Sequence, residues 1–178
     1  MDDLVKQAMA KWPNVPACYG WLGLDARGDW YMRDDQAQTA GPFSGDGATL
    51  QSKGSRLQHT ALIAFIGRNY GVDAQGNWYF QNGPQRVYVS LACTPWIARI
   101  SGDGSVKTHT GDNVKPTAAW VDEQGRCYFS LERGLALIHT QDVELFSRLL
   151  ESGVWTVQAI QSGELSARFG FNPNPQAD

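Results

Sequence analysis

Polar and apolar residues alternate over several short runs, and three of these runs contain the same kind of turn. Residues 23–33, 71–81 and 120–130 read GLDARGDWYMR, GVDAQGNWYFQ and WVDEQGRCYFS. Each has an Asp with a Gly three positions later, which is typical of a type I turn whose glycine becomes left-handed and closes a hairpin. These three turn segments therefore predict β-hairpins in which the Asp accepts hydrogen bonds from its own turn.

Two other segments follow the helical period. Residues 57–60, LQHT, precede ALIAFIGRN, and residues 137–140, LIHT, precede QDVELFSRLLES. Thr60 and Thr140 are the predicted N-caps, because a threonine hydroxyl can satisfy free N–H groups of a first helical turn. His59 and His139 then stand just before the two helices.

The repeated segments allow two interpretations. Asp25, Asp73 and Asp122 are almost evenly spaced, which suggests three equal repeats. The two His-Thr helices and the Gln-x-Gly turns at 81–83 and 161–163 favour two repeats instead. We therefore predict an α+β fold, mainly of antiparallel β-hairpins with two helices, built as two similar tandem units packed together.

The predicted divisions follow from this twofold interpretation. Residues 1–18 form an N-terminal helix and lead-in, residues 19–111 the first hairpin-helix-hairpin unit with an additional hairpin, and residues 112–171 the second unit. Each unit is expected to end in a strand, at 85–91 and 164–171. Residues 34–56, rich in Gly and Ser, are predicted to be a mobile loop, and residues 172–178 a loose polar tail.

Composition narrows the classes of function. The chain has 178 residues, 42% hydrophobic and 19% charged, which is ordinary for a globular protein with a core. A net charge of −3 without Lys/Arg runs disfavours nucleic acid as a partner, and no segment predicts a membrane partner. The start lacks a signal peptide, and Cys18, Cys93 and Cys127 are odd in number without a C-x-x-C motif. These features predict a cytoplasmic protein without disulfides.

Catalytic motifs are absent from the sequence. It contains no Walker loop, G-x-S-x-G, H-E-x-x-H or calcium-loop pattern, so no cofactor and no metal site are predicted. One alternative is an enzyme of unrecognised type that uses His59 or His139 with Cys93. The favoured interpretation is that the histidines hold repeated structural positions and that Cys93 is a buried strand residue. Catalysis is left open, with a non-catalytic role preferred.

The densest cluster of polar and aromatic residues lies at the end of the first helix and in the hairpin that follows. Arg86 offers a planar fork for a carboxylate or phosphate, and Asn82 and Gln85 offer amide groups. The competing interpretation is a capped helix, a turn and a solvated arginine. The candidate ligand-binding residues are Arg68, Asn69, Tyr70, Trp78, Asn82, Gln85, Arg86, Tyr88 and Trp96.

Several stretches together carry a family resemblance: PACYGWLGLD, ALIAFIGRNYG, WYFQNGPQRVYVSL, TPW and ARFGF. Across residues 16–171 they resemble a family of small uncharacterised proteobacterial proteins, which has no activity to carry over. The order of elements is also similar to a second uncharacterised bacterial family with a repeated α+β motif, which implies the same fold class and a regulatory or signalling role. GNWYFQNG resembles the aromatic repeats of choline- and glucan-binding cell-wall proteins, but its wide spacing here disfavours that relationship.

We therefore expect an uncharacterised cytoplasmic bacterial protein that binds a small anionic ligand or a protein partner without catalysis. The alternatives are the His/Cys enzyme and a structural subunit of a complex. Self-association into a homo-oligomer is left open.

Overall fold

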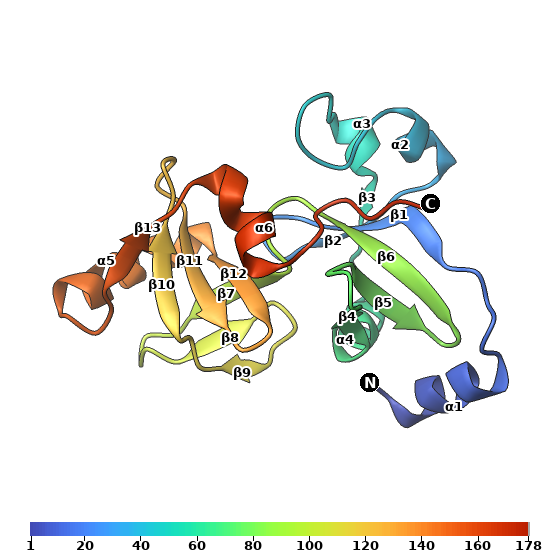
Figure 1. Ribbon diagram of the computed structural model, residues 1–178, viewed down its shortest axis with the longest axis horizontal. Coiled ribbons are helices and arrows are strands. Elements are labelled where there is room, and N and C mark those ends of the chain that lie inside the picture. The colour runs from blue at the N-terminus through green and yellow to red at the C-terminus, as the bar shows by residue number, and fades with distance from the viewer. Residues whose placement is uncertain (178) are drawn as a thin grey trace. The chain divides into compact units, whose positions relative to one another are not determined.

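The computed structural model describes residues 1–177 and combines helices and strands in two β-sheets (Figure 1). The predicted α+β class is confirmed. The internal contacts divide the chain into two compact units. Unit 1 contains residues 1–25, 29–92 and those from 172 onward, and unit 2 contains residues 26–28 and 93–171.

Unit 1 is built on a six-stranded sheet with the order β3-β2-β1-β6-β5-β4. The two central strands, β1 and β6, run parallel to each other, and all other pairs are antiparallel. The strands are β1 (Cys18–Leu24), β2 (Trp30–Met32), β3 (Ser55–Arg56), β4 (Tyr70–Val72), β5 (Trp78–Asn82) and β6 (Gln85–Leu91).

One face of this sheet is packed against a helix. Ile66 of α4 is buried, and the Phe65 ring lies edge-on to Phe80 of β5 with centroids 5.4 Å apart. Figure 1 shows α4 beside β4 and β5. Because side chains alternate along a strand, Tyr79 and Gln81 project from the opposite face. The helices of unit 1 are α1 (Asp3–Lys11), α2 (Asp35–Thr39), α3 (Leu50–Lys53) and α4 (Thr60–Arg68).

Unit 2 is built on a seven-stranded sheet with the order β13-β10-β11-β12-β7-β8-β9. β7 pairs parallel with β12, and β13 pairs parallel with β10. The strands are β7 (Trp96–Ile100), β8 (Val106–Thr108), β9 (Asn113–Val114), β10 (Ala118–Val121), β11 (Cys127–Leu131), β12 (Gly134–Ile138) and β13 (Val157–Ala159).

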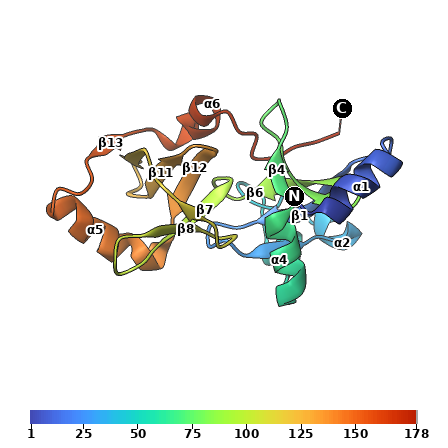
Figure 2. The ribbon, with the colours of Figure 1, turned by 90° about the horizontal axis from the view of Figure 1, so that it is seen from below.

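Helices pack on both faces of the unit 2 sheet. Phe129 of β11 contacts Phe146 of α5 edge-on at 5.3 Å, whereas Trp120 of β10 contacts Phe169 of α6 at 5.8 Å. Phe129 pairs with Ala119, the neighbour of Trp120, so the two aromatic side chains point to opposite faces. Figure 2 agrees with this placement of α5 and α6. The helical segments are η1 (Thr140–Asp142), α5 (Val143–Glu151), η2 (Ser162–Glu164) and α6 (Leu165–Phe169).

The three turn segments form hairpins as predicted. Oδ1 of Asp25, Asp73 and Asp122 accepts a hydrogen bond from the backbone N–H four residues later, at 3.0, 2.9 and 2.8 Å. The glycines three positions after them have φ of 85°, 80° and 77°, where an L side chain would be strained. The turn chemistry therefore fixes these hairpins locally.

The two predicted helices are confirmed, but their predicted caps are wrong. Nδ1 of His59 accepts a hydrogen bond from the Leu62 N–H at 3.2 Å, and Nδ1 of His139 accepts one from the Gln141 N–H at 3.1 Å. A neutral imidazole nitrogen is an acceptor and can replace the usual hydroxyl or carboxylate. His59 therefore caps α4, and His139 caps the 3₁₀ turn η1 that leads into α5, so neither cap is the threonine that follows.

The strand predicted at residues 164–171 is also wrong, because this segment contains α6. Leu165 is buried and Phe169 packs on Trp120, as expected for residues four apart on one helix face. Gly170, with φ of 64°, ends the helix in the left-handed conformation. Apolar residues at 165, 167, 169 and 171 fit a strand period, whereas on a helix only 165 and 169 share a face, so the apolar pattern alone favours the strand.

The structure divides the chain at a different place from the sequence-based domain prediction. β7, which that prediction assigned to the first unit, pairs with β12 of unit 2 through Trp96 and Ala136. The C-terminal segment is ordered on unit 1, where the Leu91 N–H donates to the Pro173 carbonyl at 2.8 Å. Residues 34–56 contain two short helices and β3. Within residues 1–177, no helix combines the length and apolar character needed to cross a membrane.

Candidate functional site

A pocket of about 400 Å³ lies between the β5–β6 hairpin and the segment that contains the end of α1. The hairpin contributes one wall because Gln81 and Arg86 are direct cross-strand partners, as are Tyr79 and Tyr88. These four side chains therefore share the sheet face that α4 does not cover. We call this the Arg86 pocket. Its lining residues are Met9, Trp12, Pro13, Val15, Ala17, Gln81, Pro84, Arg86 and Tyr88.

Arg86 is the one charged side chain among the residues that line this pocket. Its guanidinium carbon lies 4.5 Å from the centroid of the Tyr79 ring, within range of a cation–π contact. Burial alone would lower the pKa of Arg86, but the Tyr88 hydroxyl and the nearby Tyr79 and Asp73 raise it. The pocket therefore keeps a permanent positive charge with a fixed orientation.

This guanidinium differs from most others in the chain in having no ionic partner. Within residues 1–177, no carboxylate lies at ion-pair distance from Arg86. Five arginines do pair with a carboxylate: Arg56, Arg68, Arg99, Arg126 and Arg148. Arg86 can therefore accept a bidentate anion without breaking an existing pair.

Asp73 supports the pocket by fixing Tyr88, one of the lining residues. Its carboxylate accepts hydrogen bonds from the Tyr88 hydroxyl at 3.0 Å and from the backbone of Gln75 and Asn77. Burial alone would raise the pKa of Asp73, but these bonds outweigh it and lower the pKa. Burial raises the pKa of Tyr88, whose ring stacks on Tyr19 with centroids 4.7 Å apart. Tyr88 is thereby held as a neutral hydroxyl beside Arg86.

Gln81 lines the Arg86 pocket, and the residue is 1% exposed. Its Nε2 donates to the Gly83 carbonyl at 2.9 Å, while Oε1 is buried and accepts no hydrogen bond from any residue in 1–177. A buried acceptor without a partner costs about 1–3 kcal/mol. Sequence reasoning missed Gln81, although its place opposite Arg86 in the hairpin was predictable. It also missed Trp12, for which the sequence offers no signal.

Four of the predicted site residues make structural contacts away from the Arg86 pocket. Arg68 pairs with Asp2 at 3.2 Å, and Asn69 is buried and accepts a hydrogen bond from the Asp2 N–H at 2.8 Å. Tyr70 and Trp78 pack together with ring centroids 4.9 Å apart, and burial raises the pKa of Tyr70 well above its usual value. These residues anchor α1 and the sheet instead of facing the Arg86 pocket.

Two further predicted residues, Asn82 and Gln85, point to the other face of the hairpin. There they line a mainly apolar pocket of about 250 Å³ together with Phe80 and Val87. Nε2 of Gln85 donates to the Pro16 carbonyl at 3.0 Å. Of the predicted set, the structure thus brings Arg86 and Tyr88 into the Arg86 pocket.

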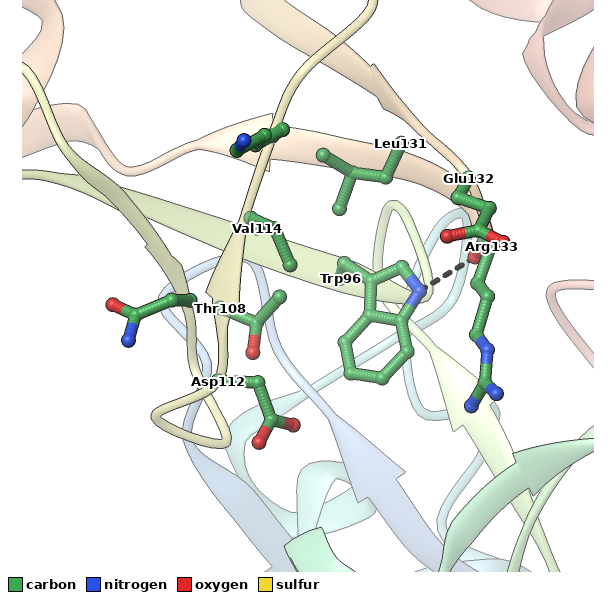
Figure 3. A pocket seen from close by; sticks show the side chains of 9 residues that line it. Trp96, Thr108, Asp112, Val114, Leu131, Glu132 and Arg133 are labelled. Atoms are coloured by element: carbon green, nitrogen blue, oxygen red, sulfur yellow. Dashed lines mark hydrogen bonds between the residues drawn. The ribbon is translucent and has the colours of Figure 1, made fainter.

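Trp96 belongs to unit 2 and lines a separate pocket of about 670 Å³, which we call the Trp96 pocket (Figure 3). Its indole Nε1–H donates to the Arg133 carbonyl at 2.7 Å. Trp96, which the sequence grouped with Arg86 as a candidate ligand-binding residue, therefore lies in unit 2 and lines a different pocket.

The proposed catalytic residues have other environments. Burial raises the pKa of the Cys93 thiol, and the groups that act on it are Arg126, Tyr128 and Asp122. A thiol with a raised pKa is a weak nucleophile at neutral pH. The described residues contain no group of three or more His, Cys, Asp or Glu side chains that could hold a metal ion.

Comparison with known proteins gives a family but no activity. The family model DUF2944, described as "Protein of unknown function (DUF2946)", matches residues 1–176. Curated proteins contain no match. Two solved structures are similar to this chain. One is a DUF1285 family protein from Silicibacter pomeroyi, with a TM-score of 0.49 and 16% identity, and the match covers 85% of this chain and 84% of that chain. The other is a DUF1285 family protein from Shewanella baltica, with a TM-score of 0.43 and 15% identity, and the match covers 72% of this chain and 91% of that chain.

Proposed function

The chain belongs to the DUF2944 family of proteins of unknown function, and we propose that it binds small carboxylate or phosphate ligands through Arg86. The observation that carries this proposal is a half-buried guanidinium in a pocket without an ionic partner among residues 1–177. An anion bound there would complete the charge pairing that five other arginines already have.

The opposite wall favours ligands with an apolar or planar part. Trp12 is 50% exposed, and Nζ of Lys11 lies 4.5 Å from the centroid of its ring, which adds a second positive charge near the opening. Pro13 and Val15 extend this apolar wall. A ligand could place its anionic group at Arg86 and its body against Trp12.

Gln81 adds a preference for a ligand that also donates a hydrogen bond. Its Oε1 is buried and accepts none from the described residues, so a hydroxyl or amide of the ligand would reach this oxygen once the Gln81 side chain turns toward the pocket, and would then remove the cost of leaving it unpaired. We therefore favour hydroxy acids or phosphorylated hydroxy compounds over simple carboxylates.

The wider role that we propose is non-catalytic binding with a regulatory or signalling output in the cytoplasm. Three free thiols support a reducing compartment. We further propose that the chain contains an internal repeat. This is supported by the order β3-β2-β1-β6-β5-β4, which matches the order β9-β8-β7-β12-β11-β10. In both, a parallel pair joins two antiparallel sets.

A titration of the whole chain tests the binding proposal. We expect phosphate, glycerate and a phosphorylated hydroxy acid to perturb the amide signals of the β5–β6 hairpin in NMR spectra. Arg86→Gln should weaken the affinity by about tenfold or more, and Arg86→Lys by less, because lysine keeps the charge but loses the fork.

The matched control is Arg148→Gln, which removes an exposed arginine of α5 in unit 2. It should bind like the wild type. Equal affinities of wild type and Arg86→Gln would remove the Arg86 pocket as the site. If no anion binds and light scattering shows a stable oligomer, a structural subunit would replace the binding role.

A further inference from the structure

We propose that the Trp96 pocket of unit 2 binds short zwitterionic peptides of about dipeptide length. The peptide would lie across the Trp96 indole, with its ammonium group toward Asp112 and its carboxylate toward Arg133 (Figure 3). This site is independent of the Arg86 pocket, because all of its lining residues belong to unit 2.

The floor of the pocket is a fixed aromatic ring. The Trp96 indole donates its Nε1–H to the Arg133 carbonyl at 2.7 Å, and the His109 ring lies 5.7 Å away, tilted by 47°. These contacts hold the ring in one orientation, although 8% of the residue stays exposed to the pocket. A rigid aromatic surface can stack a peptide group or a planar side chain with little loss of entropy.

Charges of opposite sign lie on the two sides of this floor. Figure 3 shows the Asp112 carboxylate on one side of the indole and the Arg133 guanidinium on the other. Asp112 is positioned by the Thr110 hydroxyl, which donates to Oδ2 at 2.8 Å and contacts the Thr108 hydroxyl at 2.7 Å. Within residues 1–177, neither Asp112 nor Arg133 takes part in an ion pair. Lys115 and Glu132 also line the pocket, so its lining holds two charges of each sign and suits a ligand with a positive and a negative end better than a ligand with a net charge.

The separation of the charges selects the length of the ligand. In a free α-amino acid both charged groups are attached to one carbon, so they cannot reach opposite sides of an indole ring. One additional residue extends a chain by about 3.3–3.6 Å and places the two charges on different residues. The volume of about 670 Å³ is within the range of small-ligand pockets and leaves room for side chains.

The indole N–H of Trp96 provides a direct reporter of binding. Its NMR signal can be assigned by comparison with a Trp96→Phe variant of the full chain. We expect the dipeptide Gly-Tyr to shift this signal in a saturable way. N-acetyl-Gly-Tyr lacks the ammonium group, Gly-Tyr amide lacks the carboxylate, and each should bind at least about tenfold more weakly, because one charge-assisted contact is lost. Free tyrosine should also bind weakly.

Two variants assign each end of the ligand to its partner. Asp112→Asn should bind Gly-Tyr no more tightly than N-acetyl-Gly-Tyr. Arg133→Gln should bind Gly-Tyr no more tightly than Gly-Tyr amide. The Arg133 carbonyl that holds Trp96 is a backbone group, so the second variant leaves the floor in place. Asp103→Asn, in the exposed β7–β8 turn, is the matched control and should retain both preferences. The proposal is overturned if Gly-Tyr does not shift the Trp96 signal, or if the blocked peptides bind as tightly as Gly-Tyr.

Discussion

His109 shows how burial controls the charge of a single residue. Its Nδ1 accepts a hydrogen bond from the Ile97 N–H at 3.3 Å, and its Nε2 is buried although the residue as a whole is partly exposed. Burial lowers the pKa of His109 from 6.5 to about 3. The native protein therefore keeps this imidazole neutral at pH values at which an unfolded chain would protonate it.

This shift predicts a loss of stability in mild acid. Between pH 6.5 and about 3 the unfolded state binds a proton that the native state does not, so the free energy of unfolding falls as the pH falls. The expected contribution is about 1–3 kcal/mol between pH 7 and 4.5. Urea unfolding across this range should show the decline in the wild type.

His109→Asn supplies the comparison, because the asparagine oxygen can replace Nδ1 as the acceptor for Ile97. This variant should be less stable at pH 7, since it is smaller, but should depend less on pH. The lowered pKa values of Asp122 and Asp142 act below 3.8 and so do not account for a decline at pH 5–6. Equal slopes in the two proteins would contradict the role of His109.

Among the elements, residues 34–56 depart most clearly from what their composition predicts. They are rich in Gly and Ser, yet they contain α2 and α3, and the side chain of Arg33 joins their backbone at several points. Arg33 is 5% exposed and donates to the carbonyls of Ser52 at 2.7 Å and Gly41 at 2.6 Å, and also to those of Gly20 and Ala37. One buried guanidinium thus holds this segment together, beside the buried side chains of Ala37 and Phe43.

Replacement of this guanidinium should loosen the segment. Lysine has fewer donors and no planar fork, so Arg33→Lys would leave buried carbonyls unpaired. We expect it to lower the free energy of unfolding by about 2–4 kcal/mol. It should also speed proteolytic cleavage between residues 41 and 49. Arg56→Lys is the control, because Arg56 forms an exposed pair with Asp29, and its substitution should change the stability much less than Arg33→Lys. Equal effects of the two substitutions would argue against the role of Arg33.

At the scale of the whole molecule, the chain leaves unit 1 after residue 92, forms unit 2, and returns to unit 1 at residue 172. The Asn172 N–H donates to the Gly76 carbonyl at 2.9 Å, and its Nδ2 donates to Asn77 Oδ1 at 2.8 Å. Pro175 is buried. The C-terminal segment is therefore part of unit 1 and not a loose tail.

Removal of residues 172–178 should consequently destabilise unit 1, by about 1–3 kcal/mol for the lost backbone hydrogen bonds and burial. The Leu91 amide, which donates to Pro173, should exchange its hydrogen faster in the truncated protein. A chain that ends at residue 176 keeps these contacts and should behave like the full-length protein. Unchanged exchange at Leu91 after the longer deletion would show that the segment contributes little.

The site was predicted only in part from the sequence. Arg86 and Tyr88 were identified because a hairpin brings neighbouring residues together through a turn that local chemistry encodes. Asn82 and Gln85 were grouped with Arg86, but the alternation of side chains along β5 and β6 directs them to the opposite face of the hairpin. Trp96 follows the same hairpin in the sequence, but β7 pairs with β12 in unit 2, and no local pattern marks that pairing.

The sequence by itself determined the three hairpins, the helices at 60–68 and 143–151 and the α+β class, because Asp-x-x-Gly turns and apolar periodicity act over a few residues. Tertiary structure alone decided the parallel pairings β1–β6 and β7–β12, the return of residues 172–177 to unit 1, and the helical form of residues 165–169. Each of these depends on contacts between residues that are distant in the chain. Their free energy comes from burial and hydrogen bonding with partners that no local window contains.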